Sequence, residues 1–107
     1  MVNEEIKNLL VIADNENIDA GVNHYNFRGI DCDSFSLQLK TANVTVRILC
    51  SNIQKPGASG WTDITSSLTT FTGNDFIVIQ DIKALWWQIR YERTAANNYI
   101  RAYLLKY

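Results

Sequence analysis

The chain has 107 residues, of which 47% are apolar, 20% are charged and one is proline. This length suits one domain, here residues 1–107 with residues 1–8 as an extended amino-terminal segment, and the composition excludes a disordered or fibrous chain. Because the formal net charge is only −1, the chain lacks the basic character of most nucleic-acid-binding domains, and we expect no nucleic-acid partner.

The amino-terminal segment carries Glu4 and Glu5 ahead of the apolar run Leu9 to Ala13. This run is much shorter than the ~20 residues that cross a bilayer, and the acidic residues before it are unlike a secretory signal. We therefore expect no membrane partner and assembly in the cytoplasm. Since residues 9–12 are apolar on both strand faces, we also expect Met1 to about Leu10 to contact a neighbouring subunit or partner.

Charge is distributed unevenly along the chain. Met1 to Asp33 hold seven acidic and two basic residues, a balance of −5, whereas Ser34 to Tyr107 hold four acidic and eight basic residues, a balance of +4. Chance placement on a solvated surface explains this asymmetry. An acidic leading segment that lies against a basic surface, on its own body or on a neighbour's, explains it equally well.

Alternating apolar and polar residues predict an all-β fold. Short strands are expected at residues 9–12, 22–28, 61–64 and 76–79, and strictly alternating ones at 35–40, 44–48, 87–91 and 98–104. These strands predict a single antiparallel β-sandwich or jelly-roll-like domain of about eight strands. Turn-forming residues place breaks at 14–15, 29, 55–57 and 73–74, and residues 81–84 supply at most a helical turn.

Two short connections predict hairpins. Thr41 to Asn43 have hairpin length, so the strands at 35–40 and 44–48 are expected to pair directly, and the strands at 87–91 and 98–104 to form a second hairpin. Ser36, Gln38 and Arg47 are expected to point outward. The predicted core is Phe35, Leu37, Val46, Ile48, Trp87, Ile89, Ile100 and Leu104.

The outward side chains of the second hairpin are rich in the Trp, Tyr and Arg that dominate binding interfaces. The chain's own amino-terminal segment could cover them, or they could pair across strands for sheet stability. Because a two-layer domain has no third layer to cover an aromatic outer face, we favour an intermolecular contact. The predicted interface is Leu10, Trp86, Arg90, Tyr99, Arg101 and Tyr103.

Residues suited to catalysis or cofactor binding are sparse. His24 is the only imidazole, and it falls on the polar side of its predicted strand, as a surface or hydrogen-bonded histidine does. Cys32 and Cys50 are too few and too widely spaced to supply the ligands of a zinc site. They are expected to be reduced thiols, with Cys50 packing as a small hydrophobic residue. The acidic loop Asp14 to Asp19 lacks the glycine and the final glutamate of an EF-hand. We expect no enzyme, no metal and no cofactor.

The carboxyl-terminal part of the chain resembles small β-sandwich modules. The run Val46 to Asn52 is followed by a Pro/Gly/Ser loop and then by Gly60-Trp61-Thr62-Asp63-Ile64-Thr65. Two later strands, Trp87-Gln88-Ile89-Arg90-Tyr91 and Ile100-Arg101-Ala102-Tyr103-Leu104, complete the likeness. The pattern is similar to small phage virion proteins, such as head decoration or cement proteins and head-fibre modules, and more loosely to discoidin-type carbohydrate-binding sandwiches.

This resemblance implies a non-enzymatic virion structural protein that binds a capsid or tail lattice as a decoration or cement-type subunit and forms a homo-oligomer. The alternative is a carbohydrate-binding β-sandwich module, in which Trp61 or Trp86 stacks on a sugar ring. A chain with its own Met1 and without a signal peptide favours the virion, because carbohydrate-binding sandwiches usually belong to enzymes or secreted chains.

Overall fold

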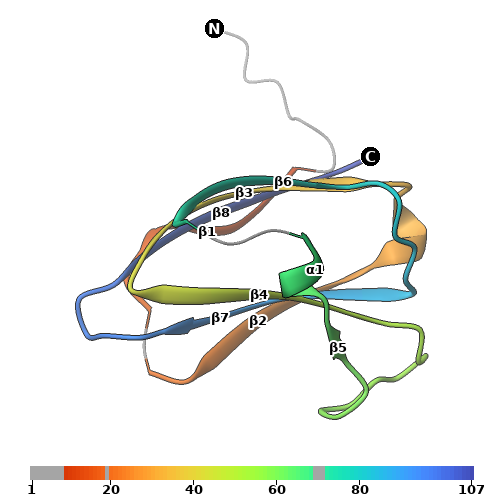
Figure 1. The fold of residues 1–107 in the computed structure, drawn as a ribbon, viewed down its shortest axis with the longest axis horizontal. Helices are drawn as coiled ribbons and strands as arrows, with labels where there is room; N and C mark the ends of the chain where they lie inside the picture. The colour runs from red at the N-terminus through yellow and green to blue at the C-terminus, as the bar shows by residue number, and fades with distance from the viewer. Residues whose placement is uncertain (1–8, 19, 69–71) are drawn as a thin grey trace, which may run out of the picture.

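The computed structural model describes residues 9–18, 20–68 and 72–107. These residues form eight strands in two antiparallel sheets that pack face to face (Figure 1), which confirms the predicted all-β sandwich. Two short turns, η1 (Gly29–Asp31) and α1 (Thr65–Leu68), accompany the strands. The strands are β1 (Leu9–Glu16), β2 (Val22–Arg28), β3 (Phe35–Ala42), β4 (Val44–Ser51), β5 (Thr62–Asp63), β6 (Asn74–Ile79), β7 (Trp86–Arg93) and β8 (Tyr99–Lys106).

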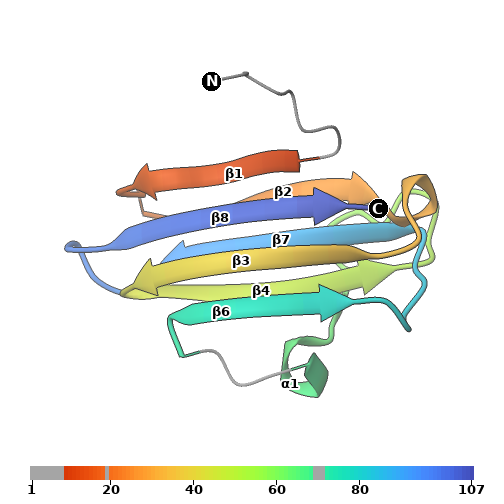
Figure 2. The ribbon, with the colours of Figure 1, turned by 90° about the horizontal axis from the view of Figure 1, so that it is seen from above.

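The strand order is that of a jelly roll. The first sheet has the order β1-β8-β3-β6 and the second sheet β2-β7-β4-β5, and Figure 2 shows β1 and β6 at the edges of the first sheet. The pairs β1–β8, β2–β7, β3–β6 and β4–β5 trace one folded ribbon. The ribbon is rolled so that β8 also pairs with β3 and β7 with β4. Two packed sheets wound in this way define the jelly roll.

Both predicted hairpins are wrong. β3 and β4 follow each other in the chain but lie in different sheets, and so do β7 and β8. The chain crosses between the sheets at Asn43, whose φ of 54° lies in the left-handed region that asparagine tolerates. Asn43 Nδ2 donates to Asn97 O (2.6 Å) and Asn43 O accepts from Thr94 N (2.8 Å), so the two corners are bonded to each other. Alternation assigns a side chain to a face, but it does not select the partner strand.

The predicted core is confirmed. All eight predicted residues are buried between the sheets, together with residues such as Phe27, Leu39 and Ile79. Phe35 lies edge-on to Phe27 and to Trp87, with ring centroids 5.0 Å and 4.8 Å apart, an arrangement that aromatic quadrupoles favour. The predicted division of side chains into inner and outer faces therefore holds on both sheets.

The expectation of an outward polar set is confirmed for Gln38 and Arg47, which are exposed. Ser36 also lies on the outer face, but it is buried. Its short side chain lies in register between Leu105 and Val78 of the two neighbouring strands. Larger neighbours on both sides account for its burial.

Strand β1 is longer than predicted. It continues through residues 14–15, where a break was expected, and ends at Glu16. Its register with β8 shifts between Val11 and Ala13, which makes Ile12 the additional residue of a bulge. As a result, both Ile12 and Ala13 pack on the core, while Val11 is exposed. The bulge thus places a run that is apolar on both faces mostly on the inner face.

Residues 81–84, which were expected to supply at most a helical turn, form none, and the two short turns lie at η1 and α1. In η1, Gly29 N donates to Leu85 O (2.9 Å), and a Cβ at this position would collide with the backbone oxygen of Ala84. Only glycine therefore fits the close approach of these two segments. The expectation that Met1 to about Leu10 contacts a partner falls mainly on residues outside those described.

Candidate functional site

The predicted interface residues lie on opposite sides of the sandwich. Tyr99, Arg101 and Tyr103 belong to β8 and lie on the outer face of the first sheet. Trp86 and Arg90 belong to β7 and lie on the outer face of the second sheet. A single face with all of these residues, as expected for a hairpin, is wrong because β7 and β8 are in different layers.

The remaining predicted interface residue, Leu10, lies opposite Leu104 in the β1–β8 register. Leu104 is a fully buried core residue, and Leu10 is a partly buried residue packed against that core. Leu10 therefore contributes to the inner face of the first sheet. Its neighbour Val11 is the outward residue of this part of β1.

Apolar side chains form a patch on the outer face of the first sheet, which we call the apolar face. The register places Val11, Tyr103 and Phe76 in one row on β1, β8 and β6, with Gln38 between Tyr103 and Phe76. Val78 lies beside this row on β6. The exposed fractions are 65% for Phe76, 59% for Val11 and 48% for Val78. The apolar face thus reaches both edges of the sheet.

Phe76 and Val78 were missed as interface residues. Their strand was predicted, and its alternation places both of them on the face opposite the buried Ile77 and Ile79. A signal was therefore available. It was hidden because the partner of β6 is β3, so only the observed pairing brings Phe76 near the predicted Tyr103.

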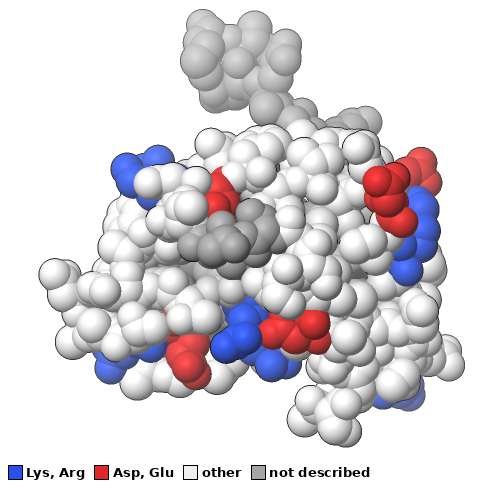
Figure 3. Space-filling view, viewed as in Figure 1, with Lys and Arg blue, Asp and Glu red and all other residues white. Residues whose placement is uncertain are grey.

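Basic residues border the apolar face. Lys40 and Arg101 lie side by side on β3 and β8, two register positions beyond Gln38 and Tyr103 and on the same face. A hollow of ≈310 Å³ lies here, with Phe76 and Asp75 among its lining residues. Figure 3, in which the two sheets are seen edge-on, shows charged side chains in small groups of mixed sign rather than in one broad patch on this side of the molecule. The apolar face therefore has a locally charged border.

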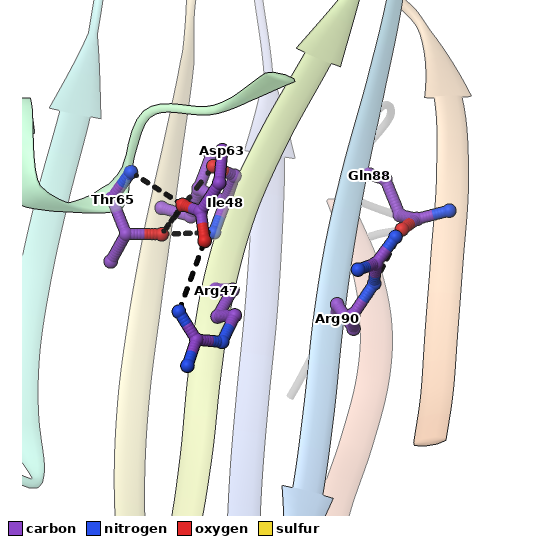
Figure 4. Close-up of polar contacts among 6 residues, drawn as sticks. All are labelled: Arg47, Ile48, Asp63, Thr65, Gln88 and Arg90. Carbon is purple, nitrogen blue, oxygen red and sulfur yellow. Dashed lines mark hydrogen bonds and ion pairs between the residues drawn. The ribbon is translucent and has the colours of Figure 1, made fainter. Parts of the chain in front are cut away.

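The outer face of the second sheet is polar and internally hydrogen-bonded. Gln88, at the middle of β7, is only 4% exposed. Its Nε2 donates to Asn26 Oδ1 on β2 (2.9 Å), and its Oε1 accepts from Arg90 Nε (2.9 Å; Figure 4). The three side chains form a continuous chain of bonds across two strands. Their orientations are fixed before any ligand binds.

The loop between β4 and β5 forms a wall beside this polar face. Trp86 Nε1 donates to Gln54 O (3.0 Å), which holds the loop against β7. Gly57 has a φ of 61°, a conformation that favours glycine in the tight turn of this loop. Between wall and sheet is a hollow of ≈610 Å³, which we call the polar groove. It is lined by Val22, His24, Asn26, Pro56, Gly57, Ala58, Trp61, Gln88 and Arg90.

The motif from Trp61 to Thr65 closes the outer edge of β4. Ile48 N donates to Thr65 Oγ1 (2.8 Å), and Ile64 N donates to Ile48 O (3.0 Å). Asp63 accepts from Thr65 N (2.9 Å), from Thr65 Oγ1 (2.6 Å) and from Arg47 Nη1 (3.1 Å), as Figure 4 shows. Burial alone would raise the pKa of Asp63, but the hydrogen bonds from Thr65 and Arg47 outweigh it and hold this pKa below its usual value.

The described titratable groups include two thiols and one imidazole. Cys32 and Cys50 are free thiols, as predicted, and burial raises the pKa of each, which disfavours the reactive thiolate. His24 is exposed on the outer face of β2, as its place in the alternation predicted. Among residues 9–18, 20–68 and 72–107, no three His, Cys, Asp or Glu side chains are grouped to hold a metal ion. Within the same residues, no helix has the length and apolar character needed to cross a membrane.

Comparison with known proteins gives no match to this chain among protein-family models, curated proteins or solved structures. The two outer faces are therefore the basis for a functional proposal.

Proposed function

We propose that this protein is a non-enzymatic virion structural protein that binds a capsid or tail lattice as a decoration or cement-type subunit, assembled in the host cytoplasm. The observation that carries the proposal is the apolar face, on which Phe76, Val11 and Val78 are each about half exposed or more. A soluble domain rarely exposes a contiguous apolar patch unless another molecule covers it.

The chemistry of the apolar face suits a protein partner. It extends across four adjacent strands, and it combines apolar residues with Tyr103, a residue type that is enriched at the centres of protein interfaces. The basic pair Lys40 and Arg101 at its border adds a preference for an acidic partner surface. The jelly-roll strand order supports the proposal only by analogy, since capsid proteins share it with lectins and cupins.

The occupant that we assign to the apolar face is the lattice protein. In this proposal, copies of the chain associate through another surface, because a face that is covered in the oligomer is not available to the lattice. The edge strand β6 has backbone N–H and C=O groups along its unpaired edge, and another copy of the chain could pair with them.

The test is binding to particles purified from the virus that encodes the chain and stripped of this protein. Phe76→Glu places a charge on the most exposed apolar residue of the apolar face and should weaken co-sedimentation by about tenfold or more, because a buried unpaired carboxylate is costly. Ile30→Glu is the matched control, since Ile30 is as exposed as Val11 but lies in η1, away from the apolar face. Equal binding of Phe76→Glu and the wild-type protein would exclude this face as the lattice contact.

Light scattering during size-exclusion chromatography tests whether the apolar face binds the lattice protein or a second copy of the chain. We expect Phe76→Glu to leave the molar mass in solution unchanged. A decrease from oligomer to monomer in this variant, but not in Ile30→Glu, would show that the apolar face joins copies of the chain and would overturn the lattice assignment.

A further inference from the structure

We infer that the polar groove on the second sheet is a binding site for a saccharide that carries a carboxylate. The groove lies on the opposite side of the sandwich from the apolar face, and its lining residues are shared with neither β8 nor β6. The inference therefore does not depend on the proposed lattice contact. At ≈610 Å³, the groove has the size of a small-ligand site.

Trp61 supplies the apolar part of the groove. One face of a pyranose ring presents C–H groups, and an indole ring offers them a broad, flat and rigid apolar surface. Trp61 lines the groove at the end of the loop, immediately before β5. Two residues after Trp61, Asp63 accepts from Thr65 Oγ1, and the same Oγ1 accepts from Ile48 N of β4. These bonds attach the chain beside Trp61 to the sheet.

Asn26, held in place by Gln88, supplies a hydrogen-bonding group on the floor of the groove. The bond from Gln88 Nε2 to Asn26 Oδ1 assigns the nitrogen Nδ2 as the remaining, donating end of the Asn26 amide. Gln88 is nearly buried and bonded at both ends, so it orients Asn26 and Arg90, while the exposed Asn26 amide offers its Nδ2 donor to a saccharide hydroxyl group. Because the network orients the amides in advance, binding costs little side-chain entropy.

Arg90 selects for the carboxylate. The Nε of Arg90 donates to Gln88 Oε1. Arginine binds a carboxylate in bidentate fashion through an edge of its guanidinium that also includes the Nη groups. His24 lies opposite Arg90 in the β2–β7 register, and none of the residues that line the groove is acidic. Arg47, the neighbour of Arg90 on β4, already binds Asp63 (3.1 Å), so it is engaged at the sheet edge.

Other ligand classes fit the groove less well. A single strand of nucleic acid needs a track of aromatic platforms and several cations along its backbone, whereas this groove has one tryptophan and one arginine. Glycoside cleavage needs a pair of carboxyl groups beside the sugar, and the lining contains none. Binding without cleavage is therefore what this arrangement supports.

The experiment is isothermal titration calorimetry of the full chain with sialyllactose and with an oligogalacturonate, against lactose as the neutral saccharide and a thymidine oligonucleotide as the nucleic acid. We expect at least one acidic saccharide to bind about tenfold or more tightly than lactose, because a charged hydrogen-bond pair adds to the affinity. Tighter binding of the oligonucleotide than of both acidic saccharides would assign the groove to another ligand class and overturn the inference.

Variants locate the site. Trp61→Ala and Arg90→Gln should each reduce the affinity for the acidic saccharide by about tenfold or more, and Arg90→Gln should also abolish the preference over lactose. Arg28→Gln is the matched control, since Arg28 is an exposed arginine of β2 that does not line the groove. Circular dichroism of each variant shows that the sandwich is folded.

Three results would overturn the inference: no binding of either acidic saccharide, equal binding of lactose, or unchanged affinity in both Trp61→Ala and Arg90→Gln. Phe76→Glu should bind the saccharide like the wild-type protein. The groove and the lattice contact can therefore fail independently of each other.

Discussion

The two outer faces of the sandwich differ although the inner faces are built alike. Both sheets place every second residue in one shared core, but the first sheet exposes Phe76, Val11 and Val78, whereas the second holds Gln88, Asn26 and Arg90 in a hydrogen-bonded chain. An apolar surface gains most from covering a large area, as a protein partner does. Oriented polar groups in a hollow gain most from a small ligand with matching groups. In a two-layer fold, specialisation is therefore carried by the outward residues and the loops.

The shared core offers the most severe test of this comparison. Ile89 is fully buried in β7, and Ile89→Ala should lower the free energy of unfolding by about 2–5 kcal/mol, because it leaves a cavity between both sheets. Urea unfolding measures this loss. Thr45→Ala, on the exposed side of β4, is the control and should stay within about 0.5 kcal/mol of the wild-type protein. A similar small loss for Ile89→Ala would mean that the two faces do not depend on a common core.

A substitution of Asn98, at one end of the sandwich, should lower the stability less than Ile89→Ala does. Asn98 is buried, its Oδ1 accepts from Ile18 N (2.8 Å), and its Nδ2 donates to the backbone oxygens of Ile18 (3.3 Å), Ala95 (3.1 Å) and Ala96 (3.1 Å). Asn98→Ala leaves these backbone groups without their partner and should destabilise the protein by about 1–3 kcal/mol. Asn97→Ala is the control, because Asn97 contributes its backbone oxygen to the bond with Asn43.

Amide hydrogen exchange would sharpen this second test. Asn98 joins the β1–β2 loop of Ile18 to the connection between β7 and β8, so both loops should exchange faster in Asn98→Ala than in Asn97→Ala. Equal exchange in the two variants would show that the buried amide does not hold this end together.

The smallest loss of stability is expected from a substitution of Asp63, which lies in β5 of the second sheet. The pKa of this carboxyl is lowered in the folded protein, so its contribution to stability is present above the ordinary carboxyl pKa and is lost as the pH falls through the folded value. Because its ion pair with Arg47 is partly exposed, Asp63→Asn should cost at most about 1 kcal/mol at neutral pH.

Thermal unfolding of wild-type protein and Asp63→Asn over an acidic pH series measures this difference. It should stay constant at mildly acidic pH and disappear at a pH below the folded pKa of Asp63. A difference that grows as the pH falls would contradict the assigned direction of the pKa shift.

The sequence predicts which residues are inside this protein better than it predicts which strands are neighbours. The period-two pattern around Leu37, Ile48 and Ile89 is a local property, and all three residues are buried as expected. Pairing depends on the corner at Asn43, where one left-handed residue turns the chain into the other sheet. A three-residue connection is compatible with both a hairpin and a crossing, so length alone favoured the wrong one.

The candidate sites were partly predictable for the same reason. Tyr103 and Arg90 were correctly assigned to outward faces, but not to different sheets. The wall of the polar groove depends on the bond from Trp86 to Gln54 O, which joins residues far apart in the chain and leaves no local sequence signal. The motif around Trp61 was identified by its resemblance to β-sandwich modules. In the structure, this motif covers the edge of β4.

The pairing of β1 with β8 has a consequence for how the protein is made. Leu9 lies opposite Leu105, so the first sheet cannot close until nearly all of the described chain has left the ribosome. In the rolled ribbon, the inner pair β4 and β5 closes the shortest loop, and each later pair must close a longer one. We expect slow folding, with β1 and β3 left without their shared partner β8 until the end of synthesis and open to pairing with other nascent chains.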